Sequence, residues 1–340
     1  MLARTIAIFN QKGGVGKTTT AMNLSGYCAM LGKKTLLIDF DSQFNATVGL
    51  GVRHDSEETI YHALLGGKRP REVIRRTYLA GLDIAPATSD LAGALIEMVE
   101  VPEREYLLRK FIHEVRSEYE YIFIDLGPSL NLLTINGLLA ADEVIIPVQC
   151  EYYSLEGIAQ VLETLDLIRK NLHHPIKIGG ALLTMYDKRE KLSREIAREI
   201  RRRFPYHVYD IEIPRSVALA EAPSFQKPIM LYAPQSSGAI AYEGLAKELL
   251  GETPFKKSET AAFYKKTYPE ELKSDAIKVP EKPRVETEYE IDYGTYDPSG
   301  IAKEDLIKIE EDDAPPLILM IHEHSATEEG GEEESHVRVF

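Results

Sequence analysis

The stretch Asn10-Gln11-Lys12-Gly13-Gly14-Val15-Gly16-Lys17-Thr18-Thr19-Thr20 follows a short apolar run, Thr5–Phe9, and precedes a helix-like run that extends to about Leu31. Glycines let a loop wrap closely around a polyphosphate with its N–H groups pointing inward, and the following helix start adds a positive dipole. Lys17 would then reach the β and γ phosphates, and the Thr18 hydroxyl would hold Mg²⁺. A plain glycine-rich turn is the simpler alternative, but this string arises by chance in only about one in ten thousand chains of this length. The stretch therefore predicts a nucleotide site.

Short apolar, β-branched runs recur through the first 250 residues, and most are separated by stretches with helical spacing. They are Thr5–Phe9, Thr35–Ile38, Leu82–Ala85, Tyr121–Ile124, Val144–Val148 and Ile176–Leu183. Runs of this kind are typical of strands buried on both faces. The alternation predicts an α/β fold, a mostly parallel twisted sheet covered by helices on both faces. Ligands in such folds lie beyond the carboxyl ends of the strands.

Composition and charge narrow the class of protein. Of the 340 residues, 44% are hydrophobic, which allows a real core, and the formal net charge is −14, so bulk charge does not favour nucleic acid or anionic lipid. The two cysteines, Cys28 and Cys150, are too few for a disulfide framework. No apolar run approaches the roughly 18 residues that span a bilayer. These features predict a soluble cytoplasmic protein without a membrane partner.

The last quarter of the chain differs from the rest. Residues 253–340 hold 11 basic and 22 acidic residues, about −11 in charge, with repeated prolines and little hydrophobic periodicity. This composition is typical of disordered or extended segments. One apolar stretch, Leu317–Ile321, interrupts this segment. It is either a chance apolar run without a role or a site that docks on a partner or on the body. We therefore expect a nucleotide-binding domain over 1–252 and an acidic tail over 253–340.

The loop departs from the ordinary P-loop at two positions. Gln11 stands where a glycine is usual, and Lys12 is an additional lysine, although two lysines beside one loop repel unless an anion lies near both. This pattern resembles the deviant Walker A motif of the ParA/MinD family of P-loop ATPases, whose signature lysine is matched by Lys12 and reaches across a dimer interface to the partner's nucleotide. The resemblance implies ATP and Mg²⁺ as cofactors and a homodimer that forms with ATP. It implies nucleotide contacts from Lys12, Gly13, Gly14, Val15, Gly16, Lys17, Thr18 and Thr19, with Lys12 and Lys17 also catalytic.

The second predicted strand ends in Asp39-Phe40-Asp41-Ser42-Gln43-Phe44-Asn45-Ala46-Thr47, which is similar to the family's Asp-x-Asp-Pro-Gln-Gly-Asn-Ala-Thr stretch. Ser42 and Phe44 depart from the usual proline and glycine. The resemblance implies that Asp41 positions the attacking water and that Asp39 lies close to the metal. If the P-loop were disregarded, the simpler interpretation would be that both aspartates are solvated loop residues.

A third carboxylate, Asp125, follows the apolar run Tyr121–Ile124, which is the Walker B pattern that places an acid near Mg²⁺. We therefore expect Thr18, Asp39 and Asp125 to form the metal site. The next residues, Leu126-Gly127-Pro128-Ser129, stand where the family usually has Cys-Pro-Pro-Ser, so Gly127 is a departure. Further stretches up to about Leu250 also resemble ParA sequences of the Soj-like partition branch.

The same resemblance suggests where the adenine lies. It would sit near the Thr184–Tyr186 turn and the Ile213–Ser216 loop, with contacts from Met185, Pro214 and Ser216, although a structural turn explains Pro214 equally well. The nitrogenase iron-protein branch of the superfamily uses two cysteines per subunit to hold an iron–sulfur cluster. Cys28 and Cys150 do not match that arrangement, so we expect no redox role.

Basic residues concentrate between 188 and 203. Family members bind DNA without sequence preference through such arginines, and the resemblance implies Arg189, Arg194, Arg198 and Arg215 as DNA contacts. Glutamates are interleaved with them, so a helix of solvated salt bridges is an equally good interpretation. A second family arginine is replaced by Ala218. DNA affinity would then be reduced, or carried by another basic cluster composed of Lys68, Arg69, Arg71, Arg75 and Arg76.

These patterns together suggest an ATPase that dimerises with ATP, binds DNA non-specifically on the nucleoid and is released when a ParB-like partner stimulates hydrolysis. Its role would be to position a chromosome, plasmid or other cargo. A MinD-like regulator at the membrane surface is the alternative, but such proteins normally end in a basic amphipathic helix, whereas this chain ends in an acidic segment. A metabolic or electron-transfer enzyme on the same scaffold would need substrate or cluster ligands that the sequence does not display.

Overall fold

The computed structural model describes residues 2–52, 58–152 and 154–252. The acidic segment 253–340, for which we predict a tail, lies outside these residues, as does its apolar stretch Leu317–Ile321. All of the runs predicted as strands are strands. They are β1 (Arg4–Ile8), β2 (Thr35–Phe40), β4 (Leu82–Ala85), β5 (Tyr121–Leu126), β6 (Glu143–Gln149) and β7 (Lys177–Thr184).

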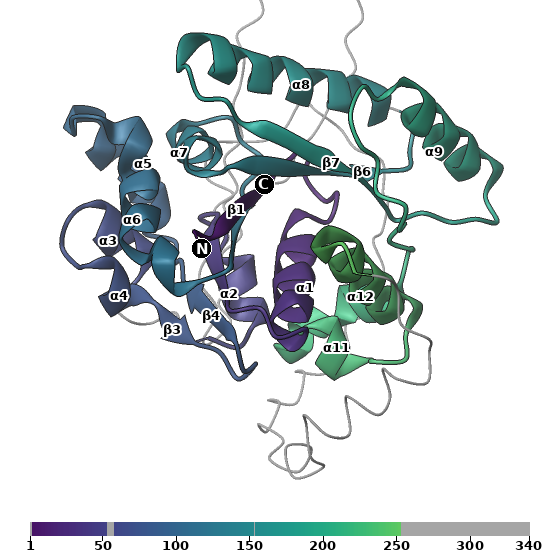
Figure 1. Ribbon diagram of the computed structural model, residues 1–340, viewed down its shortest axis with the longest axis horizontal. Helices are drawn as coiled ribbons and strands as arrows, with labels where there is room; N and C mark the ends of the chain where they lie inside the picture. Colours follow the sequence, from purple (N-terminus) through teal and green to yellow (C-terminus); the bar gives the residue numbers. More distant parts are fainter. Residues whose placement is uncertain (1, 53–57, 153, 253–340) are drawn as a thin grey trace, which may run out of the picture. The chain divides into compact units, whose positions relative to one another are not determined.

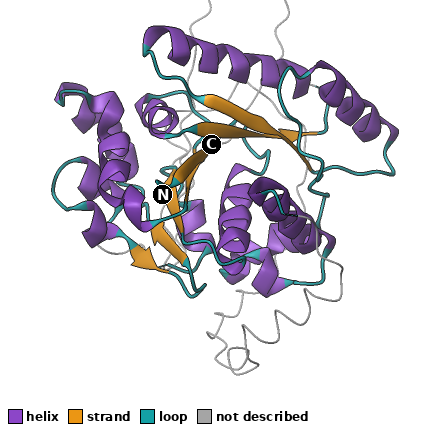
Figure 2. Cartoon of the chain, in the orientation of Figure 1, coloured by secondary structure: helices purple, strands orange, loops and turns teal. Residues whose placement is uncertain are grey.

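In the described residues the strands form one seven-stranded sheet in the order β3-β4-β2-β5-β1-β6-β7. The added strand, β3 (Arg75–Arg76), pairs antiparallel with β4 at the edge, and all other pairs are parallel. β3 was not predicted, because its two charged residues carry no periodicity. Figure 2 shows the strands in orange between helices. The prediction of a mostly parallel sheet is confirmed.

Side chains of the central strands alternate between two cores, one on each face of the sheet. Ala7 and Phe9 pack into the first core, whereas Ile6 and Ile8 pack into the second. Both faces of the central strands are therefore buried, which explains why these strands are continuous apolar runs in the sequence. Within the described residues, no helix is both long enough and apolar enough to span a membrane.

Helices cover both faces of the sheet (Figure 1). The first core is closed by α3 (Ile60–Leu64), α5 (Leu91–Glu97), α6 (Leu107–Val115), α7 (Leu132–Ala140), α8 (Ser154–Asn171) and α9 (Lys191–Arg203). The second is closed by α1 (Lys17–Met30), α10 (Val217–Glu221), α11 (Ile229–Tyr232) and α12 (Ser237–Leu250). Two further short helices are α2 (Asn45–Gly49) and α4 (Pro70–Val73), and short 3₁₀ turns span Met98–Glu100, Arg104–Tyr106, Arg116–Glu118 and Ala222–Phe225.

The central position of β5 arranges the site. Because β5 lies between β2 and β1, the register places Asp125 of β5 beside Asp39 of β2 on one side and beside Ile8 of β1 on the other. The P-loop follows β1 directly. Two carboxylates and the P-loop therefore meet at the carboxyl edge of three adjacent strands, where ligands bind in this class of fold.

Candidate functional site

The P-loop connects β1 to α1 and has the backbone of an anion-binding turn. Gly14 and Gly16 have φ angles of 72° and 89°, in the left-handed region that favours glycine. A Cβ at Gly14 would meet nothing within 4 Å, so this position favours glycine because of its backbone conformation and not because of a close neighbour. The first turn of α1 has neither a capping side chain nor an acidic residue. Its positive end is therefore left for an anion, with Gly13, Val15, Thr18 and Thr19 in the loop and the first turn.

Side chains from distant strands hold this loop in place. The Asn10 side chain donates to the Pro147 carbonyl of β6 (2.8 Å) and accepts from the Lys12 amide (3.0 Å). Thr184, at the end of β7, donates its hydroxyl to the Val15 carbonyl (2.9 Å). Thr184 was expected only as part of the adenine turn, and this anchoring role was not predicted because the contact spans 169 positions of sequence.

The two lysines of the loop have different surroundings. Lys17 is 7% exposed, and its Nζ donates to the Lys12 carbonyl (2.9 Å) across the loop. Burial lowers the pKa of Lys17, which the charges of Asp125 and Asp41 oppose. The Lys12 side chain is exposed, and its Nζ pairs with Glu151 (3.1 Å). Lys17 thus acts within its own loop, whereas Lys12 lies at the surface.

Two buried carboxylates face the loop from β2 and β5. Asp39 accepts hydrogen bonds from the amide and the hydroxyl of Thr47, both at 2.7 Å, and burial raises its pKa to about 6. Both oxygens of Asp125 are buried and have no hydrogen-bond partner among the described residues. Burial, followed by the charge of Asp39, raises the pKa of Asp125 well above its usual value. The nearby Thr18 hydroxyl partly offsets this rise without meeting hydrogen-bond geometry.

These residues suit a hard divalent cation bound together with a phosphate. Mg²⁺ is usually held by one or two carboxylates plus substrate phosphates, not by an all-protein cage. In the described part of the chain no three His, Cys, Asp or Glu side chains gather as such a cage. Asp125, as a buried carboxylate without a hydrogen-bond partner among the described residues, and the adjacent Thr18 hydroxyl fit the predicted metal site, whereas one oxygen of Asp39 is already bonded twice by Thr47.

Asp41 lies just beyond the strand end, where Gln43 donates its amide to it (3.1 Å). A Cβ on Gly127 would lie 3.2 Å from both Cγ and Oδ1 of Asp41, so this departure from the family pattern leaves room for the carboxylate. Phe44, another departure, adopts a φ of 40°, the region that the family's glycine favours. The loop therefore keeps its left-handed turn despite the bulky side chain.

The two loops expected to hold adenine are brought together at the end of β7. Tyr186 donates its amide to the Ile213 carbonyl (3.0 Å) and accepts from the Arg215 amide (3.3 Å), which aligns Tyr186 with Pro214. Met185 forms the turn with a φ of 49°. Met185 directly follows Thr184, which bonds the P-loop, and Pro214 is aligned with the next residue, Tyr186. Ser216 is the residue before α10. The adenine contacts themselves stay a prediction.

Of the predicted DNA arginines, Arg189 precedes α9, Arg194 and Arg198 lie on α9, and Arg215 lies in the loop before α10. Arg189 pairs with Asp187 (2.7 Å), and Arg194 donates to the carbonyls of Lys188 (2.8 Å) and Arg189 (3.0 Å). Arg198 has no hydrogen bond or ion pair to a described residue. Arg215 is exposed and close enough to Asp187 to lower the pKa of that carboxyl.

Glutamates pair with other basic residues of α9. Lys191 lies 3.8 Å from Glu195, and Glu199 accepts from both Arg202 and Arg203 at 2.7 Å. The last turn of α9 is therefore a set of solvated salt bridges, as one interpretation held. The first turns differ, because Arg194 and Arg198 do not pair with the interleaved glutamates.

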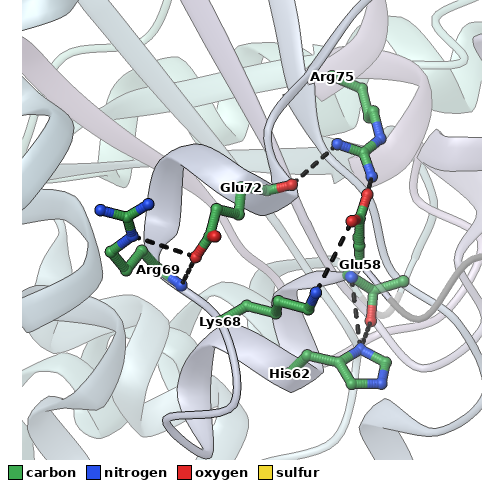
Figure 3. A network of polar contacts seen from close by, with 7 residues as sticks. Glu58, His62, Lys68, Arg69, Glu72 and Arg75 are labelled. Carbon is green, nitrogen blue, oxygen red and sulfur yellow. Dashed lines mark hydrogen bonds and ion pairs between the residues drawn. The ribbon is translucent and has the colours of Figure 1, made fainter.

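The alternative basic cluster is bound to acidic neighbours (Figure 3). Glu58 pairs with Arg75 and with Lys68 (3.7 Å), and Glu72 pairs with Arg69 (3.2 Å). Outside the figure, Arg71 pairs with Glu118 (2.5 Å). Four of the five basic residues named for this cluster thus have a carboxylate partner, and only Arg76 has none among the described residues. The sequence did not show this, because Glu58 and Glu118 are distant along the chain.

Comparisons with known proteins agree with this geometry. A family model described as an AAA domain matches residues 3–178. The sporulation initiation inhibitor protein Soj of Bacillus subtilis is 49% identical over 249 residues, which are 73% of this chain and 98% of that protein. The chromosome partitioning protein ParA of Myxococcus xanthus is 47% identical over 250 residues, 73% of this chain and 88% of that protein.

Among solved structures, cobyrinic acid a,c-diamide synthase of Mycobacterium smegmatis, with bound ADP and magnesium, is 34% identical. Its TM-score is 0.65, and the match covers 73% of this chain and 94% of that one. The identity to the partition proteins is higher and extends over nearly their whole length. The chain therefore belongs to the ParA/Soj family of chromosome-partitioning P-loop ATPases.

Proposed function

We propose that the chain is an ATP-dependent dimerising switch, with Mg²⁺ as its metal, that binds DNA non-specifically. It hydrolyses ATP weakly until a ParB-like partner stimulates it, and thereby positions a chromosome, a plasmid or other cargo. The observation that carries this proposal is the pair of buried carboxylates, Asp39 and Asp125, in register beside the P-loop lysine Lys17. The cost of burying them would be offset by a bound cation, which can also be shared with a polyphosphate.

Each residue of the site then has a chemical role. Lys17 and the first turn of α1 hold the phosphates, and Thr18 and Asp125 hold Mg²⁺, with Asp39 beside them. Bound Mg²⁺ would neutralise charge that develops on the transferred phosphoryl group. Asp41 stands outside the buried pair, where its carboxylate would accept a hydrogen bond from the attacking water and orient it.

The position of Lys12 supports a role in dimerisation. The Lys12 side chain is 41% exposed, and its Nζ pairs with Glu151 at the surface, whereas the Nζ of Lys17 bonds a carbonyl of its own loop. An exposed pair of this kind contributes little stability, so Lys12 can leave Glu151 at small cost. We infer that Lys12 reaches the nucleotide of a second copy and that ATP links the two subunits.

DNA binding and partner control are the finer parts of the proposal. The exposed Arg189, Arg198 and Arg215 offer charge to phosphates without base contacts, which suits non-specific binding. The family assignment supports release by a ParB-like partner. Non-specific DNA binding would place the protein in the cytoplasm, on the nucleoid.

The MinD-like alternative is less well supported. The Pyrococcus furiosus cell division ATPase MinD is 25% identical with a TM-score of 0.62, which is well below the identity to Soj. The metabolic alternative has a structural neighbour in the diamide synthase, at 34% identity. Both remain less similar in sequence than the partition proteins.

The two lysines provide the test. Lys17→Ala should abolish ATP binding, whereas Lys12→Ala should keep part of it and fail to dimerise. Light scattering with and without ATP and Mg²⁺ measures the size, and fluorescent-nucleotide titration measures binding. Lys110→Ala is the matched control, because Lys110 also forms an exposed ion pair, with Glu103 (2.7 Å). A Lys12→Ala protein that dimerises as the wild type does would refute the role of Lys12.

A further inference from the structure

The strongest ion pair of the predicted DNA surface lies within one short loop. Arg189 donates Nη2 to Asp187 Oδ2 (2.7 Å) and Nε to Oδ1 (3.0 Å), which is the bidentate geometry of the strong arginine–carboxylate pairs. The Arg189 amide also donates to Oδ1 (2.9 Å). One edge of the guanidinium is thus occupied by a carboxylate, which accepts hydrogen bonds from the same N–H groups that a DNA phosphate would use.

The loop fixes the backbone of Asp187. The Asp187 amide donates to the hydroxyl of the buried Ser193 (3.1 Å), and the Asp187 carbonyl accepts from the Glu190 amide (3.1 Å). The Asp187 side chain is 14% exposed, whereas that of Arg189 is 85% exposed. The arginine is therefore open to a ligand, while the backbone that carries the aspartate is tied to the start of α9.

Two other arginines of this surface, Arg215 and Arg194, lie near the Asp187–Arg189 pair. The hydrogen bonds from Arg189, and then its charge and that of Arg215, hold the pKa of Asp187 at about 2, so Asp187 is ionised at neutral pH. Arg215 reaches this place because its amide bonds the Tyr186 carbonyl (3.3 Å), one residue before Asp187. Arg194 lies over the carbonyl of Arg189 (3.0 Å). Asp187 thus offsets part of the charge of these arginines, and Glu190 adds a second negative charge close to Arg189.

We propose that Asp187 is a built-in competitor of DNA phosphate that limits the DNA affinity of this surface through Arg189. This inference rests on the proposed DNA binding. A phosphate that takes the Nε–Nη2 edge of Arg189 must displace Asp187, and the carboxylate cancels one positive charge that would otherwise release a counterion. The competition keeps binding weak at any one site, which suits a protein that must leave DNA after hydrolysis.

The test compares DNA affinity over a salt series for Asp187→Asn, Arg189→Ala and the double variant, each with ATP and Mg²⁺. Asp187→Asn should bind several-fold tighter at low salt, with a slope of log K against log salt that is steeper by up to about one. Arg189→Ala should weaken binding, and adding Asp187→Asn to it should restore little. Asp166→Asn is the matched control, because Asp166 pairs with Arg169 (3.0 Å) on α8, outside the predicted DNA surface. Nucleotide binding of each variant checks that it folds.

The outcomes separate this inference from the proposal on which it rests. If Arg189→Ala binds DNA as the wild type does, the proposed DNA surface is wrong. If Arg189→Ala weakens binding but Asp187→Asn leaves it unchanged or weaker, only the competitor role is wrong, and Asp187 instead orients Arg189. An equal gain in Asp166→Asn, or a full gain in the Arg189→Ala background, would reduce the effect to general charge and also overturn the inference.

Discussion

The carboxyl edge of the sheet and the arginine surface at α9 are both charged, but their charges are arranged in opposite ways. At the sheet edge, Asp125 is buried and has no hydrogen-bond partner among the described residues. At the surface, Arg189 is 85% exposed and already bound to Asp187. In the first region the two buried carboxylates Asp39 and Asp125 outnumber the one buried lysine, Lys17, whereas in the second the arginine has its own carboxylate.

This difference bears on how each region would respond to a ligand. A buried carboxylate without a hydrogen-bond partner is costly, so a cation that relieves it would bind with a large gain. An exposed arginine with an internal partner gains only the difference between two similar contacts, in a solvent that screens both. We therefore expect large effects from changes at the sheet edge and small, salt-dependent effects at the surface.

The largest effect is expected for Asp41→Ala. A positioned group that orients water contributes about 10²- to 10⁴-fold to a rate, so turnover should fall by at least about 100-fold while ATP binding and dimerisation persist. Phosphate release and light scattering measure the two properties on the same sample. Turnover at the wild-type rate would remove Asp41 from the mechanism. Gly127→Ala should lower turnover less, because its Cβ would lie 3.2 Å from the Asp41 carboxylate and displace it.

The next effect concerns pH and Asp39. Burial raises the pKa of Asp39 to about 6, so between about pH 4 and pH 6 the folded chain keeps a proton that the unfolded chain has released. Ionisation of Asp39 therefore lowers stability as the pH rises through this window, by on the order of 3 kcal/mol at full ionisation. Asp39→Asn should become more stable relative to wild type over the same window, apart from a constant offset due to Thr47. Urea unfolding at each pH measures this.

A relative stability of Asp39→Asn that stays level or falls as the pH rises would contradict this account. Mg²⁺ with ATP should reduce the difference between the two proteins above about pH 6, because a nearby cation favours the ionised carboxylates. Removal of Mg²⁺ by a chelator should restore it.

A smaller effect should distinguish the two basic regions. Arg189→Ala should weaken DNA binding about tenfold at low salt and flatten the salt slope by about one, for every DNA sequence tested. Arg71→Ala should change little, because Arg71 is paired with Glu118 in the alternative cluster. A gel-shift series over salt compares them, and the reverse order of effects would move the DNA surface to the cluster between Lys68 and Arg76.

The smallest effect is expected from the acidic segment 253–340. A charge of about −11 tethered to the domain acts at high effective concentration and would compete with DNA for its arginines. A protein truncated after Glu252 should bind DNA a few-fold tighter at low salt, with a difference that fades as the Debye length shortens from about 10 Å at 0.1 M towards 3 Å at 1 M. Equal affinity of the two forms at low salt would leave the segment inert or assign it to partner binding.

The P-loop and the strands that frame it could be predicted from residue types alone. Gly14, Gly16 and Lys17 lie within a few positions of one another, so the turn and its lysine can be recognised without knowing any distant contact. The central strands have both faces buried, which makes them continuous apolar runs that are readable from residue type alone. The carboxylates Asp39 and Asp125 were predictable because each ends such a run.

The pairing of charges depends on the tertiary structure. Thr47 bonds one oxygen of Asp39 and leaves Asp125 without a hydrogen bond, a distinction that depends on how α2 turns back over β2. Thr184 joins the P-loop from β7, and Glu58 pairs with two residues of a basic cluster, Lys68 and Arg75. Backbone conformation and hydrophobic periodicity are set by neighbours along the chain, whereas an ion pair depends on a few ångströms between residues that the sequence separates.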